Sequence, residues 1–266
     1  MPAAPKTSQK LAGKKYVLLG GTSGIGFAVA SALIEEGASV VVSSSGSARV
    51  EEAIRKLSDA EQQFNADPSR ASGHALDLFG PEVESRLNTF FAKVGPIDGL
   101  IHSAGDSLDP LSLEEVTYQS IVERSSVRYF SVILAIKAAL PHLKPHSSIV
   151  FTSGTNADQP IPGLGIMSGL AAGLYGLARG LALDLSPRRI RVNAVVPGAT
   201  LTELFERLPA EMKNYLLEEA SKQPTWRVGH PEDVAQTYLY LLKDDNITGQ
   251  TIKSDSGKAI GPRPGA

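Results

Sequence analysis

The chain alternates between two hydrophobic patterns. Short runs rich in Val, Ile and Leu, bounded by glycine, serine or other polar residues, are typical of strands buried inside a sheet. Longer stretches place apolar residues at helical spacing. The first pattern predicts strands in segments 16–21, 39–45, 72–78, 95–105, 147–154, 189–198 and 249–257. The second predicts helices at 24–36, 47–64, 120–143 and 161–185.

The alternation of strands and helices predicts an α/β protein whose parallel sheet is covered on both faces. We expect a doubly wound Rossmann fold with seven parallel strands, formed by residues 1–266 as a single domain because no linker-like stretch divides the chain. The helical segment 199–228 lies between the sixth and seventh strands and is expected to form a lid. Residues 259–266 suit no regular element and are expected to be loose.

Composition narrows the function classes. The 266 residues carry a formal net charge of −2, which gives no electrostatic reason to bind nucleic acid or a membrane surface. The absence of cysteine excludes disulfides, thiolate metal sites and cysteine nucleophiles. The five histidines are scattered without metal-ligand spacing, so no metal site is expected. Without an apolar signal segment or a run of about 18 apolar residues, we expect a cytoplasmic protein with no membrane span.

The stretch GGTSGIG, residues 20–26, joins the first strand to the first helix. Its glycines permit a tight turn and let a pyrophosphate approach the backbone, where free N–H groups at the helix start bind the negative charge. The turn therefore predicts a dinucleotide site rather than an ordinary strand–helix connection. The residues assigned to this site are Gly20, Thr22, Ser23, Gly24, Ile25 and Gly26.

The end of the second strand bears on the choice of cofactor. An acidic side chain there would bind the adenosine ribose and repel a 2′-phosphate. The chain instead has SSSGSAR at 43–49, in which Ser44, Ser45 and Arg49 offer hydroxyl donors and a cation. This segment favours NADP(H) over NAD(H), the alternative being that the serines only form a loop.

These motifs make the chain resemble the short-chain dehydrogenase/reductases over nearly its whole length. The resemblance rests on the glycine turn, on LDL at 76–78, on HSAG at 102–105, on RVNAVVPGATLT at 191–202, and on GHPEDVA and ITGQ further along. It implies a nicotinamide cofactor. The further cofactor-binding residues that it implies are Asp77, Leu78, Ala104, Gly105, Pro197, Gly198, Thr200 and Thr202, the last four along the nicotinamide.

The catalytic positions of that family have changed. Its Tyr-x-x-x-Lys pair, whose spacing puts both side chains on one helix face, falls at Met167 and Ala171. Its serine falls at Gly154, beside Ser153, and its helix asparagine falls at Arg128. The resemblance therefore implies that ordinary ketone reduction or alcohol oxidation fails, because general acid help is worth roughly 10²–10⁴-fold in rate.

Two kinds of reaction need no such acid. Hydride can reach an iminium carbon directly, since the ion already carries the positive charge, and a bound nicotinamide can form one wall of a pocket in which an apolar substrate cyclises. Tyr175 is no substitute for the missing tyrosine, because it lies two helical turns, about 12 Å, beyond Met167. The apolar side chains expected around this pocket, with ordinary core packing as the alternative, are Leu164, Ile166, Met167 and Leu170.

Arg128 and Ser153 are the catalytic candidates. A guanidinium donates no proton near neutral pH, so Arg128 would anchor a carbonyl oxygen or the cofactor, a solvated helix face being the alternative. Ser153 is the hydroxyl donor beside the family's serine position. His102 replaces an asparagine of the family and is expected to be a buried structural residue.

The loop SGTNADQPIPGLG at 153–165 resembles a branch of fungal short-chain dehydrogenases that includes the NADPH-bound reductase/Diels–Alder cyclases of bicyclic indole alkaloid pathways. Where those enzymes use an aspartate this chain has Ile161, and Asp158 is out of register. The resemblance implies an enzyme of secondary metabolism that reduces or cyclises an activated, iminium-like apolar substrate, such as an alkaloid or polyketide intermediate.

Two alternatives stay open. The first is a non-redox cyclase or isomerase that uses NADP(H) as a scaffold, and the second is an inactive NADP(H)-binding partner protein. The family resemblance also implies a homodimer or homotetramer that pairs the helices at 120–143 and 167–185 across a two-fold axis.

Overall fold

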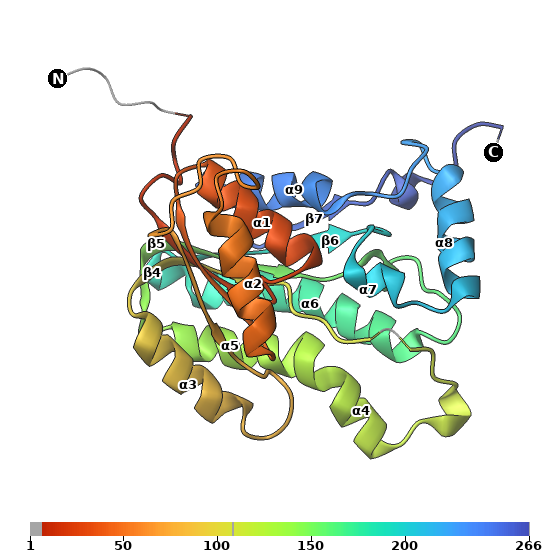
Figure 1. The fold of residues 1–266 in the computed structure, drawn as a ribbon. Helices are drawn as coiled ribbons and strands as arrows, with labels where there is room; N and C mark the ends of the chain where they lie inside the picture. Colours follow the sequence, from red (N-terminus) through yellow and green to blue (C-terminus); the bar gives the residue numbers. More distant parts are fainter. Residues whose placement is uncertain (1–6, 108, 266) are drawn as a thin grey trace.

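A seven-stranded parallel sheet with strand order β3-β2-β1-β4-β5-β6-β7 forms the centre of the molecule (Figure 1). The computed structural model describes residues 7–107 and 109–265. The strands are β1 (Lys15–Leu19), β2 (Ser39–Ser44), β3 (Ala71–Ala75), β4 (Ile97–His102), β5 (Leu143–Thr152), β6 (Arg191–Pro197) and β7 (Thr251–Ser254). The predicted doubly wound Rossmann fold with seven parallel strands is therefore confirmed.

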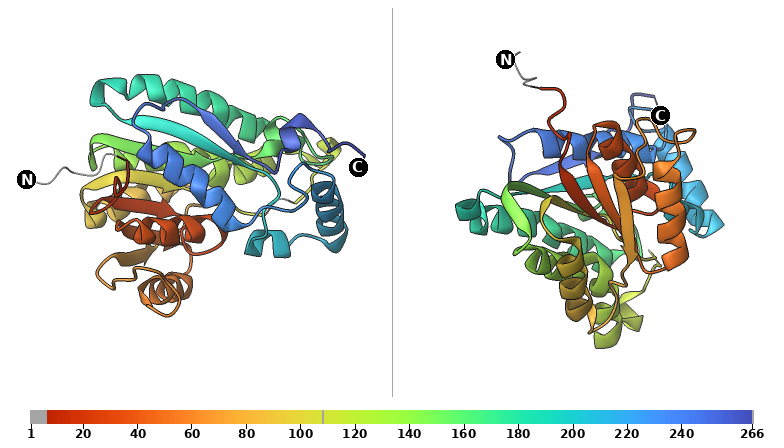
Figure 2. Two further views of the ribbon diagram at one scale, coloured as in Figure 1. Left: turned by 90° about the horizontal axis from the view of Figure 1, so that it is seen from above. Right: turned by 60° about the vertical axis from the view of Figure 1, so that its left-hand side comes forward.

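Helices cover both faces of this sheet (Figures 1 and 2). On one face lie α1 (Gly24–Glu35), α2 (Ser47–Ser58) and α9 (Pro231–Lys243), and on the other lie α3 (Val83–Val94), α5 (Ser131–Ala139) and α6 (Gly165–Asp184). Successive strand residues point to opposite faces, so Leu18 and Leu19 of β1 belong to different hydrophobic clusters, and both are 0% exposed. This two-sided burial explains why the strands read as continuous apolar runs.

The predicted helix at 47–64 ends earlier, because α2 stops at Ser58. The carboxylate of Asp59 accepts hydrogen bonds from the backbone N–H of Glu61 and the side-chain amide of Gln62. Such a local side-chain bond competes with helix continuation. The predicted third strand likewise ends at Ala75 rather than 78.

The predicted helix at 120–143 is interrupted. α4 (Tyr118–Ser125) runs into one turn of π-helix, Ser126–Phe130, before α5 begins. The hydroxyls of Ser125, Ser126 and Ser131 each donate to the carbonyl four residues earlier, at 2.7–2.8 Å. Serine back-bonding of this kind bends helices, and single π-turns often occur at functional sites. This one carries Arg128.

α6 begins at Gly165 rather than at 161 because the proline-rich loop precedes it. It is 20 residues long with a mean hydropathy of 1.4, which is long and apolar enough to cross a membrane by length and composition alone. No membrane span is expected from the sequence, because the chain has no uninterrupted run of about 18 apolar residues. In the fold, α6 packs along β6 and only 28% of its apolar window is buried.

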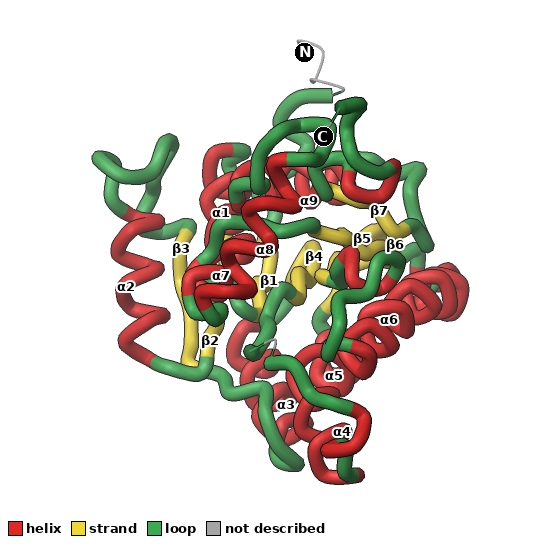
Figure 3. The backbone as a smooth tube through the Cα atoms, turned by 90° about the vertical axis from the view of Figure 1, so that its right-hand side faces the viewer, coloured by secondary structure: helices red, strands yellow, loops and turns green. Residues whose placement is uncertain are grey.

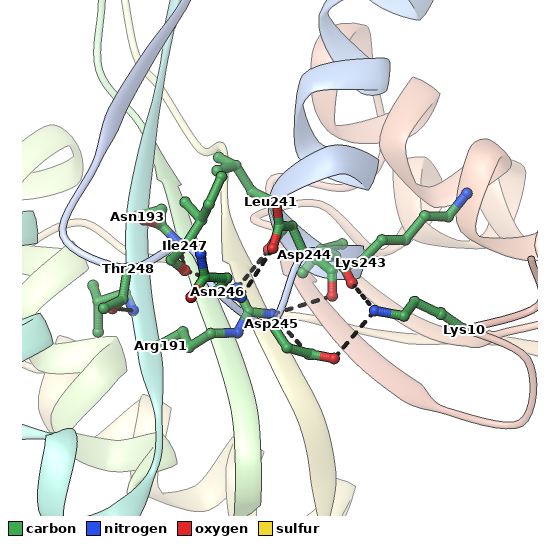
Figure 4. A network of polar contacts seen from close by, with 12 residues as sticks. Lys10, Arg191, Asn193, Leu241, Lys243, Asp244, Asp245, Asn246, Ile247 and Thr248 are labelled. Atoms are coloured by element: carbon green, nitrogen blue, oxygen red, sulfur yellow. Dashed lines mark hydrogen bonds and ion pairs between the residues drawn. The ribbon is translucent and has the colours of Figure 1, made fainter. Parts of the chain in front are cut away.

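Arg191 and Asn193, in the segment RVNAVVPG, tie β6 to the end of α9 (Figure 4). The Arg191 guanidinium donates to the carbonyls of Leu241 and Ile247 at 2.6 and 3.1 Å. The Asn193 amide donates to the Ile247 carbonyl at 3.1 Å and its oxygen accepts from the N–H of Gln250 at 3.0 Å. These bonds satisfy buried backbone groups between α9 and β7, so this part of the motif has a structural task.

The segment expected to form a lid contains two helices, α7 (Glu203–Glu206) and α8 (Ala210–Ser221). They stand in front of the carboxyl ends of the strands (Figure 3). The segment expected to be loose contacts α8 and the loop after it. Arg263 lies 3.6 Å from the ring centroid of Trp226 and its N–H donates to the Lys222 carbonyl at 2.8 Å.

His102, the last residue of β4, is 2% exposed. Its Nε2 lies 2.8 Å from the hydroxyl oxygen of Ser131, whose own proton is directed at the Val127 carbonyl. Burial lowers the pKa of His102 to about 4, so the ring is neutral at physiological pH. The expected structural role fits this contact, which links the sheet to the start of α5.

Candidate active site

A cleft of about 520 Å³ opens at the carboxyl ends of the strands. It lies where the connections from β1 and β4 leave the sheet toward opposite faces, which is where ligands bind in open α/β sheets. The candidate residues from the sequence all contribute to its walls, namely Gly20, Thr22, Ser23, Gly24, Ile25, Gly26, Ser44, Ser45, Arg49, Asp77, Leu78, Ala104, Gly105, Pro197, Gly198, Thr200, Thr202, Arg128 and Ser153.

The glycine turn forms the floor of the cleft between β1 and α1. Gly20 has a φ of +85°, and a Cβ at this position would lie 2.5 Å from the backbone nitrogen of Ala104. A Cβ on Gly26 would collide with the Gly20 carbonyl oxygen and the Ser103 hydroxyl. Side chains at these two positions would therefore force the turn away from the loop after β4.

No side chain caps the first turn of α1 among the described residues, since Ser23 makes no side-chain hydrogen bond there. The N–H groups of that turn are left for solvent or a ligand. Together with the positive end of the helix dipole, they suit a pyrophosphate. The uncapped first turn of α1 is therefore the feature of the cleft that fits a dinucleotide.

The adenosine end of the cleft carries hydroxyls and a cation. Arg49 donates from Nη2 to the Ser45 hydroxyl at 2.7 Å, and Ser44 donates to the Gly46 carbonyl at 3.3 Å. Ser43 is 0% exposed and its hydroxyl has no partner within the described part of the chain. Asp77 lies across from them, with its carboxylate accepting the N–H of Phe79 at 3.0 Å.

The segment after β6 forms the opposite wall. Gly198 donates its N–H to the Ser254 carbonyl at 2.9 Å and lies against the backbone of Asp255. Thr200 donates its hydroxyl to the Gly198 carbonyl at 3.0 Å. The Thr202 hydroxyl accepts the N–H of Phe205 at 3.2 Å and so caps α7. The residues expected along the nicotinamide therefore also hold the segment that leads to α7.

Beyond this wall the cleft widens into what we call the apolar chamber. α6 and the loop before it contribute one side, and α7, α8 and their connection contribute the other. Ile166 does not line the cleft, unlike the three other apolar residues expected there. The apolar side chains of the chamber are Ile161, Leu164, Met167, Leu170, Leu174, Leu204, Phe205, Leu208 and Leu216.

Arg128 extends from the π-turn to the floor of the chamber. Its Nε donates to the Asp106 carboxylate at 2.7 Å, and its Nη2 donates to the Asp106 carbonyl. A Cβ on Gly105 would lie 3.0 Å from Nη2, so the guanidinium covers this glycine. The Arg128 side chain is 22% exposed. Burial lowers the pKa of its guanidinium, and the Asp106 carboxylate opposes that shift.

Ser153 lines the chamber, but its hydroxyl is engaged. It donates at 2.9 Å to the carbonyl of Ala171, which lies one turn after Met167 on α6. Tyr175 does not line the cleft, and its hydroxyl donates to the Asp158 carboxylate at 2.9 Å. Asp158 in turn pairs with Lys253 at 2.9 Å. Over residues 7–107 and 109–265, no tyrosine or histidine forms part of the cleft wall.

Sequence reasoning missed three charged residues of the cleft. Asp106 directly follows the HSAG motif, so its adjacency to that motif was a usable signal. Glu203 and Lys258 also line the cleft, yet they follow segments whose course was not predictable from hydrophobic pattern. The side chain of Glu203 lies near Gly24, where a Cβ would approach its Oε2 to 3.5 Å.

The comparison with known proteins identifies the family. A family model described as the SDR-like Rossmann domain matches residues 7–260. The short-chain dehydrogenase/reductase malC of Malbranchea aurantiaca is 35% identical over 269 residues, which cover 98% of this chain and 100% of that protein. The short-chain dehydrogenase/reductase ucsE of an Acremonium species is 36% identical over 265 residues, which cover 97% and 99% of the two chains.

Solved structures agree with this assignment. The structure of the MalC reductase/Diels-Alderase from Malbranchea aurantiaca has a TM-score of 0.86 at 34% identity and covers 96% of this chain and 100% of that one. A dehydrogenase/reductase from Sinorhizobium meliloti 1021 has a TM-score of 0.82 at 31% identity, with 95% and 97% covered. The chain therefore belongs to the short-chain dehydrogenase/reductases, a family of oxidoreductases whose Rossmann fold binds nicotinamide cofactors.

Proposed function

We propose that this protein is an NADP(H)-dependent reductase of secondary metabolism that transfers hydride to an activated, iminium-like apolar substrate. The observation that carries the proposal is the apolar chamber, which has Met167 and Ala171 on α6 where the family resemblance implies a tyrosine and a lysine. The chamber suits a bulky apolar molecule and offers it no phenolic proton.

An iminium ion removes the need for that proton. The nicotinamide supplies a hydride, which forms a C–H bond at the iminium carbon while the C=N π electrons move to nitrogen and neutralise it. The products are a neutral amine and NADP⁺, so charge and electrons balance without a proton from the protein. A ketone would instead require protonation of its oxygen, and general acid help of that kind is worth about 10²–10⁴-fold.

Three features support NADP(H) as the cofactor. The end of β2 carries no carboxylate. Ser44, Ser45 and Arg49 line the adenosine end, and Arg49 already lies within hydrogen-bond distance of the Ser45 hydroxyl. A 2′-phosphate there would gain charge-assisted hydrogen bonds from Arg49.

The hydrogen bonds of Arg128 support a role for this residue in orienting the substrate. Two of its donors are occupied by Asp106, and Nη1 has no acceptor within the described residues. A substrate carbonyl in the chamber would satisfy this remaining donor. Because Asp106 pairs with the guanidinium, the site would hold a carbonyl without presenting a full positive charge to an iminium ion.

A cyclase is the second candidate function. It is favoured by the likeness to the MalC protein, whose name joins reductase and Diels-Alderase activities, and by the chamber, which would hold a folded apolar substrate. A binding protein without catalysis is the third. It has no specific support, because a protein that only binds NADP(H) has no need of an apolar chamber in the same cleft.

We propose further that the protein is a homodimer or a tetramer of two-fold pairs. α6 leaves most of its apolar window uncovered, with Leu183 75% exposed, and Phe130 and Ile133 beside it are 42% and 37% exposed. An added Cβ at Gly169, Gly176 or Gly180 would meet nothing within 4 Å, so another helix can approach closely. A monomeric mass in solution at micromolar concentration would contradict this assembly.

The function is tested with a matched pair of bicyclic probes, the N-methyl-dihydroisoquinolinium ion and the ketone tetralone. We expect NADPH-dependent reduction of the iminium ion and a rate at least about a hundredfold lower for the ketone, because only the ketone needs a general acid. Absorbance of NADPH follows both reactions, and the products to be identified are the tertiary amine from the iminium ion and the alcohol from tetralone. Efficient reduction of tetralone would reject the proposal and would identify a hidden donor, with Ser153 the first candidate.

The cofactor is tested with Arg49→Ala. We expect the affinity for NADPH to fall about tenfold to a hundredfold and the affinity for NADH to stay unchanged, because only the 2′-phosphate contacts the guanidinium. Arg55→Ala is the matched control, since Arg55 is an exposed residue of the same helix that pairs with Glu52. Equal NADPH and NADH affinities in the unaltered protein would refute the assignment.

Arg128→Ala tests substrate orientation with two iminium probes, one unsubstituted and one bearing a carboxamide. We expect kcat/KM to fall about tenfold to a hundredfold for the carboxamide probe only, with NADPH affinity retained, because only that probe has a carbonyl for Nη1. Arg124→Ala is the control, since Arg124 donates to the Asp109 carbonyl at 2.6 Å outside the cleft. A fall in NADPH affinity would assign Arg128 to the cofactor, and no change would leave it without a role.

A further inference from the structure

Lys258 lines the cleft from the turn Lys258–Ile260, which follows β7. It is half-buried, and it is the single lysine that lines the cleft within residues 7–107 and 109–265. The C-terminal segment that carries it runs beside α8 (Figure 1). Lys258 therefore belongs to the same chamber as the proposed reaction but comes from an element that the cofactor contacts do not involve.

The backbone around Lys258 is held by a dense set of hydrogen bonds. The Asp255 carboxylate accepts the N–H groups of Gly257 and Ala259 at 3.0 and 2.9 Å. The Lys258 N–H donates to the Asp255 carbonyl at 3.0 Å, and the Lys258 carbonyl accepts the Gln159 side-chain amide at 2.8 Å. These hydrogen bonds hold the backbone of Lys258 in place.

The backbone conformation of the turn also restricts the position of Lys258. Ser256 has a φ of +60°, in the left-handed region that disfavours residues with a side chain, and Gly257 has a φ of +82°. A Cβ on Gly257 would lie 2.7 Å from the Pro224 ring. Glycine at position 257 therefore meets both the left-handed φ and the packing of the turn against Pro224.

The ammonium of Lys258 has no carboxylate within 4.0 Å among the described residues, in contrast to the other charges around it. Asp106 is paired with Arg128, and Asp158 is paired with Lys253. The Asp255 carboxylate is occupied by backbone N–H groups. Lys258 is thus a cation of the cleft wall with no ion-pair partner among the described residues.

Arg128 and Lys258 both line the cleft, but they are carried by different elements. Arg128 covers Gly105 after β4, whereas Lys258 follows β7, and the sheet order puts three inter-strand spacings between these strands. At about 4.8 Å for each spacing, the two strands lie about 14 Å apart. The two cations therefore come from separate parts of the cleft wall.

We infer that Lys258 is a specificity-determining residue that binds an anionic oxygen group, such as a carboxylate or enolate, on the end of the apolar substrate remote from the reacting carbon. An ammonium beside apolar walls binds such a group more strongly than it would in water, because screening by solvent is reduced. The inference deepens the proposed function by naming the substrate class, and it rests on that function only in placing both groups in one chamber.

Dye binding tests the inference without any turnover. Anilinonaphthalene sulfonate is apolar and anionic, and phenylnaphthylamine is its uncharged counterpart. We expect Lys258→Met to weaken binding of the sulfonate dye about tenfold or more and to leave the neutral dye unaffected, because only the sulfonate contacts the ammonium. Lys258→Arg should retain sulfonate binding. Fluorescence titrations of both dyes, with and without saturating NADP⁺, provide the dissociation constants.

Two further variants locate the effect. Lys222→Met removes the same charge from the end of α8, where Lys222 pairs with Glu218 and Glu219, and should change neither dye. Leu170→Trp fills the chamber and should weaken both dyes. The inference is overturned if Lys258→Met affects both dyes or neither, if Lys222→Met has the same effect, or if sulfonate binding survives in Leu170→Trp. None of these outcomes depends on hydride transfer. A failure of this inference can therefore be told apart from a failure of the proposed reaction.

Discussion

The close approach of the glycine turn after β1 to the loop after β4 determines the shape of the whole site. Gly20 and Gly26 leave room for Ala104 and Ser103 only because they lack a Cβ. This contact puts the uncapped start of α1 at the floor of the cleft, beside Gly105. The cofactor half of the site therefore depends on backbone packing rather than on any reactive side chain.

The part of the cleft proposed for the substrate depends on the residues that stand where the family resemblance implies a proton donor. Met167 and Ala171 give α6 an apolar wall, and α7 and α8 contribute further apolar side chains to the chamber. Among the charged residues that line the cleft, Arg128 and Asp106 form an ion pair, whereas Lys258 has no ion-pair partner among the described residues. We propose that this part of the cleft selects its substrate by shape and by the charge of Lys258, and that the substrate is already activated.

The residues that line the cleft at the ends of β1 and β2 could be predicted from the sequence because their signals are local. A glycine turn between a buried strand and a helix, and serines with an arginine after β2, are each read within a few residues. Asp106 follows a motif and could have been noticed, but its pairing with Arg128, 22 positions away, was not predictable, and neither was the contact of Lys258 with Gln159, 99 positions away. The π-turn that carries Arg128 was not predicted either. Hydrogen bonds from serine hydroxyls to carbonyls four residues earlier leave no periodic pattern in the sequence.

The central claim is that hydride transfer in this chamber proceeds without a proton from the protein. Single-turnover reduction of an iminium ion, with NADPH deuterated at the transferring position and in deuterated water, tests this claim directly. The account predicts a primary isotope effect clearly above unity from deuterated NADPH and a solvent isotope effect close to unity on the same step. A solvent effect clearly above unity on hydride transfer would contradict the account, because it would place a proton in flight in the transition state.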